Sequence, residues 1–162
     1  MAVRNLVTVR ETGAGKFSQR VELGRHVLAA DEPVEVGGAD SGPSPIQFML
    51  ASLGSCTSMT LRVYAAHKKW ALGAIRVEVF HERVKGETGA PYDRFDRVIH
   101  VEGALTEDER AKLVEIAGKC PMHKLLMAAI ISCSRKFRNG RHGTGMRLHS
   151  HHAPPHFCTT TP

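Results

Sequence analysis

The chain has 162 residues, and its 42% hydrophobic content is enough for one domain with a core of its own. The longest apolar run, residues 125–131, is too short to cross a bilayer, and residues 1–13 contain no apolar stretch of signal-peptide length. These features argue against a membrane-spanning protein, and we expect a soluble, cytoplasmic one with no membrane partner.

The net charge of +6 comes entirely from the C-terminal part of the chain. All 16 acidic residues lie at or before Glu115, and residues 1–119 also carry 16 of the 22 lysines and arginines. The excess positive charge therefore belongs to a segment with Gly, Pro and His residues and no recognisable binding module. We expect no specific nucleic-acid partner.

The first forty residues have the pattern of an antiparallel β meander. Residues 3–9 are rich in β-forming side chains, a Gly-containing turn follows, and residues 17–23 and 25–30 supply two further strands. Residues 31–45 contain three glycines and three prolines, which predicts a loop, and loops of this length are often functional.

A long helix follows this loop. Ser44 is its predicted N-cap, Pro45 its first residue, and Gln47 completes a capping box. Apolar residues occur nearly all round the helix up to about Lys68, which predicts burial on most sides. Cys56 lies at its middle.

The second half of the chain predicts two more strands and two more helices. Residues 75–80 and 94–101 alternate between apolar and polar side chains, as paired strands do. Thr106 and Glu109 form a second capping box, which opens a helix that ends near Lys119.

Pro121 disfavours helical geometry at the residue before it and begins a short helix through Leu126. Residues 129–134 have the composition of a closing strand. We predict one domain over residues 1–134 and a disordered, basic, His-rich tail over residues 135–162. The acid-free composition of this tail is also what a shifted reading frame in the gene would produce.

Cys120 occupies the cap position of the short helix. Its sulfur there faces unpaired backbone N–H groups and the positive end of the helix dipole, and both favour the thiolate. A buried free cysteine is also often a small packing residue, so the position alone leaves both interpretations open.

Cys56 has less support from local chemistry, because a cysteine in the middle of a buried helix is more often a packing residue than a nucleophile. Small residues surround it over residues 51–58 and leave space beside the thiol. Gly54 costs the helix about 1 kcal/mol relative to alanine, and the close approach of another element would explain it.

Two ordered motifs resemble the OsmC/Ohr family of organic-hydroperoxide-handling proteins. Residues 37–45, followed by Leu53-Gly54-Ser55-Cys56-Thr57, form the first, and Cys120-Pro121-Met122-His123 forms the second. The resemblance covers residues 3–126 and is closer to the less characterised OsmC-like branches. It implies an α+β, two-layer fold with an N-terminal meander, a long central helix bearing Cys56, a second sheet portion and a second helix, assembled as an intertwined homodimer.

The resemblance also implies an activity. Cys56 would be the peroxidatic cysteine, which reduces an organic hydroperoxide to an alcohol and becomes a sulfenic acid. Cys120 would resolve this acid as a disulfide, and a dithiol reductant of the lipoyl or thioredoxin type would restore the thiols. No cofactor or metal is implied.

The family also uses an arginine from the N-terminal sheet, oriented by a glutamate at the start of the cysteine helix. Arg25 is the best placement for the arginine, with Arg20 as its rival. The glutamate positions hold Ile46 and Gln47, and Gln47 can hydrogen bond an arginine but lacks the charge of a carboxylate. This departure predicts a weaker peroxidase or a cation positioned in another way.

Two alternatives remain open. One is a non-catalytic, thiol-sensing or small-molecule-binding member of the same fold. The other is a metal-binding Cys/His protein, since Cys120 and His123 have the spacing of metal ligands and more Cys and His residues follow. No second paired motif with the spacing of structural zinc sites accompanies them.

Overall fold

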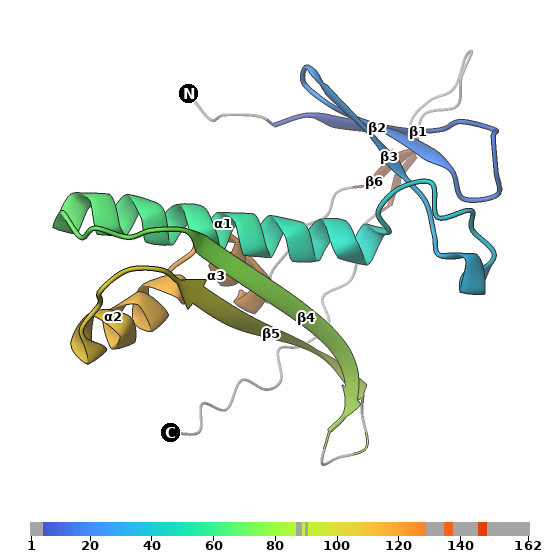
Figure 1. Ribbon diagram of the computed structural model, residues 1–162. Coiled ribbons are helices and arrows are strands. Elements are labelled where there is room, and N and C mark those ends of the chain that lie inside the picture. The colour runs from blue at the N-terminus through green and yellow to red at the C-terminus, as the bar shows by residue number, and fades with distance from the viewer. Residues whose placement is uncertain (1–4, 87–88, 90, 129–134, 138–145, 149–162) are drawn as a thin grey trace.

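The computed structural model describes residues 5–86, 89, 91–128, 135–137 and 146–148 (Figure 1). The fold is α+β, as predicted. It opens with a three-stranded antiparallel sheet of β1 (Val7–Glu11), β2 (Gln19–Leu23) and β3 (His26–Ala30), in that order. The first strand extends further along the chain than predicted because Arg10 and Glu11 still pair with β2.

The glycine-rich loop after β3 is ordered around a buried carboxylate. Asp31 accepts hydrogen bonds from the Ser41 hydroxyl at 2.7 Å and from the backbone N–H groups of Glu32, Ala39 and Ser41. These bonds, the one from the Ser41 hydroxyl first, hold the pKa of Asp31 below its usual value. A Cβ at Gly38 would lie 1.8 Å from the Glu32 carbonyl oxygen, so this position requires glycine. The loop thus delivers the chain to the next helix in a fixed path.

Helix α1 (Pro45–Lys68) has the predicted bounds and the predicted capping box between Ser44 and Gln47. Its buried residues form one stripe of mostly four-residue spacing: Leu53, Gly54, Thr57, Leu61 and Ala65. The other side of the helix is open in the single chain, where Met59 is 68% exposed and Val63 is 70% exposed. The expectation that α1 is covered on most sides is therefore wrong for the single chain.

Strands β4 (Ile75–Lys85) and β5 (Pro91–Val101) form a two-stranded antiparallel ribbon, in which both strands extend beyond their predicted bounds. The ribbon packs closely on α1 at Gly54, which has no side chain. A Cβ at Gly54 would lie 3.2 Å from Val79 Cγ2 of β4. The close approach inferred from Gly54 is confirmed.

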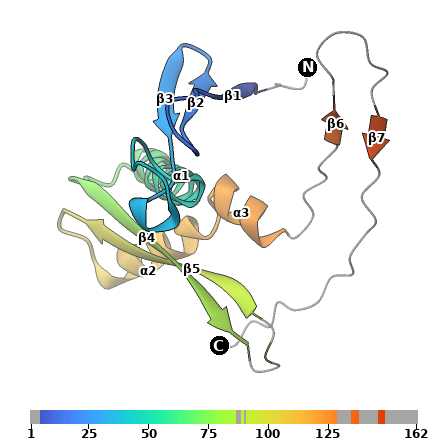
Figure 2. The same cartoon turned by 90° about the vertical axis from the view of Figure 1, so that its right-hand side faces the viewer.

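Helix α2 (Glu107–Ala117) begins with the predicted capping box of Thr106 and Glu109, and α3 (Pro121–Met127) begins after Cys120. Leu61 of α1 and Leu113, Ile116 and Ala117 of α2 form the core against apolar residues of the ribbon. Figure 2 shows α1 between the β1–β3 sheet on one side and the β4–β5 ribbon on the other. The middle of α1, which carries Cys56, thus packs on β4 and α3 on one side and stays open on the other.

Strands β6 (Arg135–Phe137) and β7 (Met146–Leu148) pair antiparallel within the segment predicted to be a tail. The predicted closing strand, residues 129–134, lies outside the described residues, as does the rest of the tail. None of the helices in the described part of the chain is long and apolar enough to span a membrane.

Candidate functional site

The two cysteines singled out by the sequence, 64 positions apart, meet between α1 and α3. Cys56 is half-buried at the middle of α1, and Cys120 is fully buried at the cap of α3. Both are free thiols, and the side chain of Cys56 lies within hydrogen-bonding reach of the Cys120 sulfur. The fold therefore places a half-buried thiol directly against a buried one.

The two thiols differ in acidity. Burial raises the pKa of Cys56, and donation of its S–H to Cys120 raises it further. Burial alone would also raise the pKa of Cys120, but donors from Cys56, His123, Thr57 and Met122 outweigh this effect and lower it below the usual thiol value. The two thiols titrate as a pair, and these contacts favour the first negative charge on Cys120.

The backbone donors to Cys120 follow from its position. Met122 and His123 lie in the first turn of α3, where backbone N–H groups have no partner within the helix, and these N–H groups help to lower the pKa of the Cys120 thiol, although the sulfur makes no capping hydrogen bond. The helix-start environment inferred for Cys120 is thus present in the structure.

A pocket of about 530 Å³ opens beside Cys56. Its lining combines two hydroxyl-rich turns of α1 with apolar side chains of α1 and α3: Ser52, Ser55, Cys56, Met59, Thr60, Val63, Pro121 and Met122. A small apolar molecule can reach Cys56 through this pocket, whereas Cys120 has 0% of its surface exposed. Cys56 is thus the accessible thiol of the pair, and Cys120 is the one with the lowered pKa.

Arg97 of β5 hydrogen bonds to three residues close to Cys56 and Cys120 along the chain, and sequence reasoning missed it. Its NH1 donates to Thr57 Oγ1 and to the Ala117 carbonyl, both at 3.0 Å, and its NH2 donates to His123 Nδ1 at 3.2 Å. The strand pattern contained a signal: Arg97 occupies the same face of β5 as the half-buried Phe95 and Ile99.

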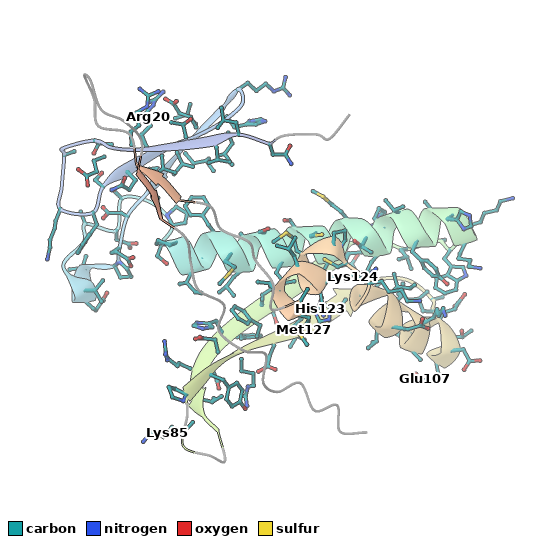
Figure 3. All side chains as sticks on the ribbon, turned by 180° about the vertical axis from the view of Figure 1, so that it is seen from behind. Arg20, Lys85, Glu107, His123, Lys124 and Met127 are labelled. Carbon is teal, nitrogen blue, oxygen red and sulfur yellow. The ribbon has the colours of Figure 1, made fainter. Side chains whose placement is uncertain are left out.

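The arginines predicted for this role lie elsewhere. Arg25 is exposed in the turn between β2 and β3, and Arg20 Nε donates to Glu22 at 3.0 Å. Figure 3 shows Arg20 on the N-terminal sheet, well away from His123 on α3. Within the described part of this single chain, the groups that set the acidity of Cys56 and Cys120 include neither arginine. A catalytic role for Arg25 stays a prediction.

Gln47 stands at one of the two positions where the family pattern has a glutamate. It already makes the capping-box hydrogen bonds at the start of α1. Its Oε1 accepts from the Ser44 backbone N–H at 2.8 Å, and Ser44 Oγ accepts from the Gln47 N–H at 3.5 Å. The preceding residue, Ile46, is apolar and half-buried. The capping role of Gln47 is confirmed, and its catalytic role stays a prediction.

The metal-binding alternative finds no geometry to support it in the part of the chain that the structure describes. No three His, Cys, Asp or Glu side chains converge there as a cation site. His123 Nδ1 is already an acceptor for Arg97. The remaining residues of that hypothesis, in the His-rich tail, lie outside the described residues.

Comparison with known proteins identifies the family. The family model described as OsmC-like protein matches residues 38–134, which is more than half of the chain. The chain belongs to the OsmC-like protein family. The matched region contains Cys56, Arg97 and Cys120, whereas Arg20 and Arg25 precede it. No curated protein matches the chain.

Solved structures show the same fold. An OsmC-like protein from Mycoplasma pneumoniae is 18% identical with a TM-score of 0.65, over 80% of this chain and 91% of that one. An organic hydroperoxide resistance protein from Legionella pneumophila is 20% identical with a TM-score of 0.61, over 78% and 90%. One from Elizabethkingia anophelis, with thiocyanate bound, is also 20% identical with a TM-score of 0.61, over 80% and 93%. At such identities the likeness shows the OsmC-like fold.

The burial of His123 beside Arg97 makes the stability of this OsmC-like domain depend on pH. Burial, and the nearby Arg97 guanidinium, lower the pKa of His123 from its ordinary value of 6.5. The unfolded chain therefore takes up a proton at His123 before the folded chain does, as the pH falls. The contribution of His123 to stability is complete above pH 6.5 and is lost as the pH falls toward the lowered pKa.

The free energy of unfolding of the wild type should fall between about pH 7 and about pH 5. We expect a smaller fall in His123→Gln, because glutamine offers Arg97 an oxygen but does not titrate. Urea unfolding of both proteins at the two pH values measures this difference. His67→Gln, at the exposed end of α1, is the matched control and should behave as wild type. An unchanged pH dependence in His123→Gln would contradict the assignment.

Proposed function

We propose that this chain is a thiol-dependent peroxidase that reduces organic hydroperoxides to alcohols. The observation that carries the proposal is the contact between two free thiols of unequal access and acidity. Cys56 lines an open pocket and can meet a substrate, and Cys120 is buried against it with a lowered pKa. This is the arrangement that a peroxidatic and a resolving cysteine require.

The acidity of the pair suggests how the first step proceeds. The Cys120 thiolate accepts the proton of Cys56 as the Cys56 sulfur attacks the distal peroxide oxygen and the O–O bond breaks. The alkoxide that leaves takes up this proton and departs as an alcohol, and Cys56 becomes a sulfenic acid. The Cys120 thiolate then attacks the Cys56 sulfur and displaces hydroxide, which forms a disulfide.

The cycle closes when an external dithiol reduces this disulfide by thiol exchange. We propose a reductant of the lipoyl or thioredoxin type, since Cys56 is the accessible sulfur for the first exchange. The attack would release Cys120 as the leaving thiolate, and its lowered pKa favours that departure.

The pocket supports an organic substrate. Met59, Val63, Pro121 and Met122 give it an apolar lining next to the Cys56 thiol. The burial of a substrate's hydrocarbon group contributes about 25 cal/mol per Å² of apolar surface, a contribution that hydrogen peroxide cannot gain. The Legionella and Elizabethkingia proteins of the same fold are described as organic hydroperoxide resistance proteins.

We also propose that the protein is a homodimer. Large apolar side chains that do not line the pocket remain exposed in the single chain, among them Leu125 and Met127 of α3. Their burial against a second copy would remove this surface from water. The sedimentation mass of the purified protein should be that of two chains, and a stable monomer at micromolar concentration would contradict the proposal.

The activity is tested by counting free thiols after the reduced protein is mixed with cumene hydroperoxide. We expect two of the four thiols per chain to disappear and a peptide that links Cys56 to Cys120 to form. Cumyl alcohol, which has the same hydrocarbon group but no peroxide bond, is the control and should leave all thiols free. Unchanged thiols at millimolar peroxide would refute the proposal.

A non-catalytic, thiol-sensing role is the second candidate, and one observation favours it. The helix start offers Gln47, already used as a cap, where the family pattern has a carboxylate. A sensor would form the disulfide once but would not consume peroxide repeatedly in the presence of excess dithiol. Multiple turnovers with dihydrolipoamide or thioredoxin would exclude this role.

A further inference from the structure

One side chain holds three of the groups that contact Cys120. The Thr57 hydroxyl and the His123 backbone N–H both help to lower the pKa of the Cys120 thiol, and the Cys120 backbone N–H donates to the Ala117 carbonyl at 3.4 Å. Arg97 donates to the Thr57 hydroxyl, to the same Ala117 carbonyl and to the His123 ring. These three residues belong to α1, α2 and α3, so Arg97 connects every helix around the buried thiol.

The hydrogen bond from Arg97 to Thr57 limits where the hydroxyl proton of Thr57 can point. A guanidinium N–H can only donate, so the Thr57 oxygen accepts from Arg97 and its single hydroxyl proton must point elsewhere. Two acceptors are available: the Leu53 carbonyl, at 2.8 Å, and the Cys120 sulfur. In the structure the proton points to the Leu53 carbonyl, and a thiolate at Cys120 offers it a charged acceptor instead. Donation from the Arg97 cation polarises the hydroxyl and would strengthen a hydrogen bond from Thr57 to that thiolate.

The position of Arg97 depends on the packing of the ribbon on α1. Arg97 is the register partner of Val79, and Val79 is the side chain that approaches Gly54. The ribbon therefore comes close enough to α1 for Arg97 to reach Thr57, three residues further along the helix. In the described part of the chain, no Asp or Glu forms an ion pair with Arg97, so its charge is not neutralised by a carboxylate there.

We propose that Arg97 is a positioning residue for the dithiol, which holds Thr57, Ala117 and His123 in place around Cys120 so that their donors can stabilise a thiolate there. This inference rests on the proposed function for its purpose, but its physical content is the ionisation of one thiol. That ionisation is measurable without peroxide.

The test uses a background in which Cys56, Cys133 and Cys158 are replaced by serine, so that Cys120 is the only thiol. Its ionisation is followed by the ultraviolet absorbance of the thiolate against pH. We expect Arg97→Met to raise the midpoint by about one unit, which is about a tenfold loss of thiolate at lower pH. Arg97→Lys, which keeps the charge but cannot reach three acceptors, should recover part of this shift.

Arg94→Met is the matched control, because Arg94 lies on the opposite face of β5 and pairs with Glu82 and Asp96. It should leave the midpoint unchanged. Circular dichroism and urea unfolding establish that each variant is folded, and Arg97→Lys decides the matter if Arg97→Met does not fold. A folded Arg97→Lys or Arg97→Met with an unchanged midpoint would overturn the inference.

A double-mutant cycle tests whether Arg97 acts through Thr57. Thr57→Val keeps the shape of the side chain but removes the hydroxyl, and it should also raise the midpoint. The shift in the double variant with Arg97→Met should be smaller than the sum of the single shifts, because both remove the same donor. Fully additive shifts would exclude this route. If these shifts occur but no peroxide is consumed, the positioning role stands and the peroxidase proposal fails.

Discussion

Replacement of Cys56 by serine should slow the oxidation of the remaining thiols by cumene hydroperoxide about a thousandfold or more. Cys56 is the thiol that lines the pocket, and a serine hydroxyl in its place is a poor nucleophile at neutral pH. Cys120 keeps the nearby backbone N–H groups of α3 in this variant but is fully buried. The initial rate of peroxide loss with excess reduced protein measures the effect.

Cys120→Ser is the comparison that assigns the two roles. It should still consume one equivalent of peroxide, and the sulfenic acid of Cys56 should then accumulate and be trapped by dimedone. The opposite pattern, in which Cys120→Ser blocks the first oxidation and Cys56→Ser does not, would reverse the assignment. That pattern has a physical basis, because acidity alone favours Cys120 as the nucleophile while access favours Cys56.

The second large effect concerns the core that supports the site. Leu113 of α2 is 3% exposed and packs against Leu61, so Leu113→Ala should lower the free energy of unfolding by about 2–5 kcal/mol. Its neighbour Val114 is 68% exposed, and Val114→Ala should change the free energy of unfolding by less than about 0.5 kcal/mol. Urea unfolding at a fixed protein concentration compares the two. Equal losses would show that Val114 is covered in the assembled protein.

Local signals in the sequence predicted the elements that carry the thiols. Both capping boxes, at Ser44 and at Thr106, form as predicted, because each depends on side chains within three residues of one another. The cap position of Cys120 follows equally from Pro121 beside it. Such features need no knowledge of the rest of the fold.

Long-range contacts account for what the sequence did not reveal. Arg97 reaches Thr57 across 40 positions of the sequence and His123 across 26. The period-two pattern of the strand predicts that Arg97 shares a face with apolar residues, but it does not predict these partners. The same limit applies to strand length, since β4 and β5 extend through charged residues that pair across the ribbon, such as Glu82 with Arg94. The prediction of Arg25 drew on family resemblance, and in this chain its side chain is exposed in a turn.

The proposed disulfide between Cys56 and Cys120 would link the redox state of the protein to its resistance to unfolding. The two residues are 64 positions apart, and a covalent bond between them would close a loop of about 65 residues in the unfolded chain. A loop of that size lowers the conformational entropy of the unfolded chain by an amount equivalent to about 4 kcal/mol at room temperature. If this disulfide forms, the dithiol form is the one that unfolds more readily, and a cell that keeps the site reduced also keeps the domain nearer to proteolysis.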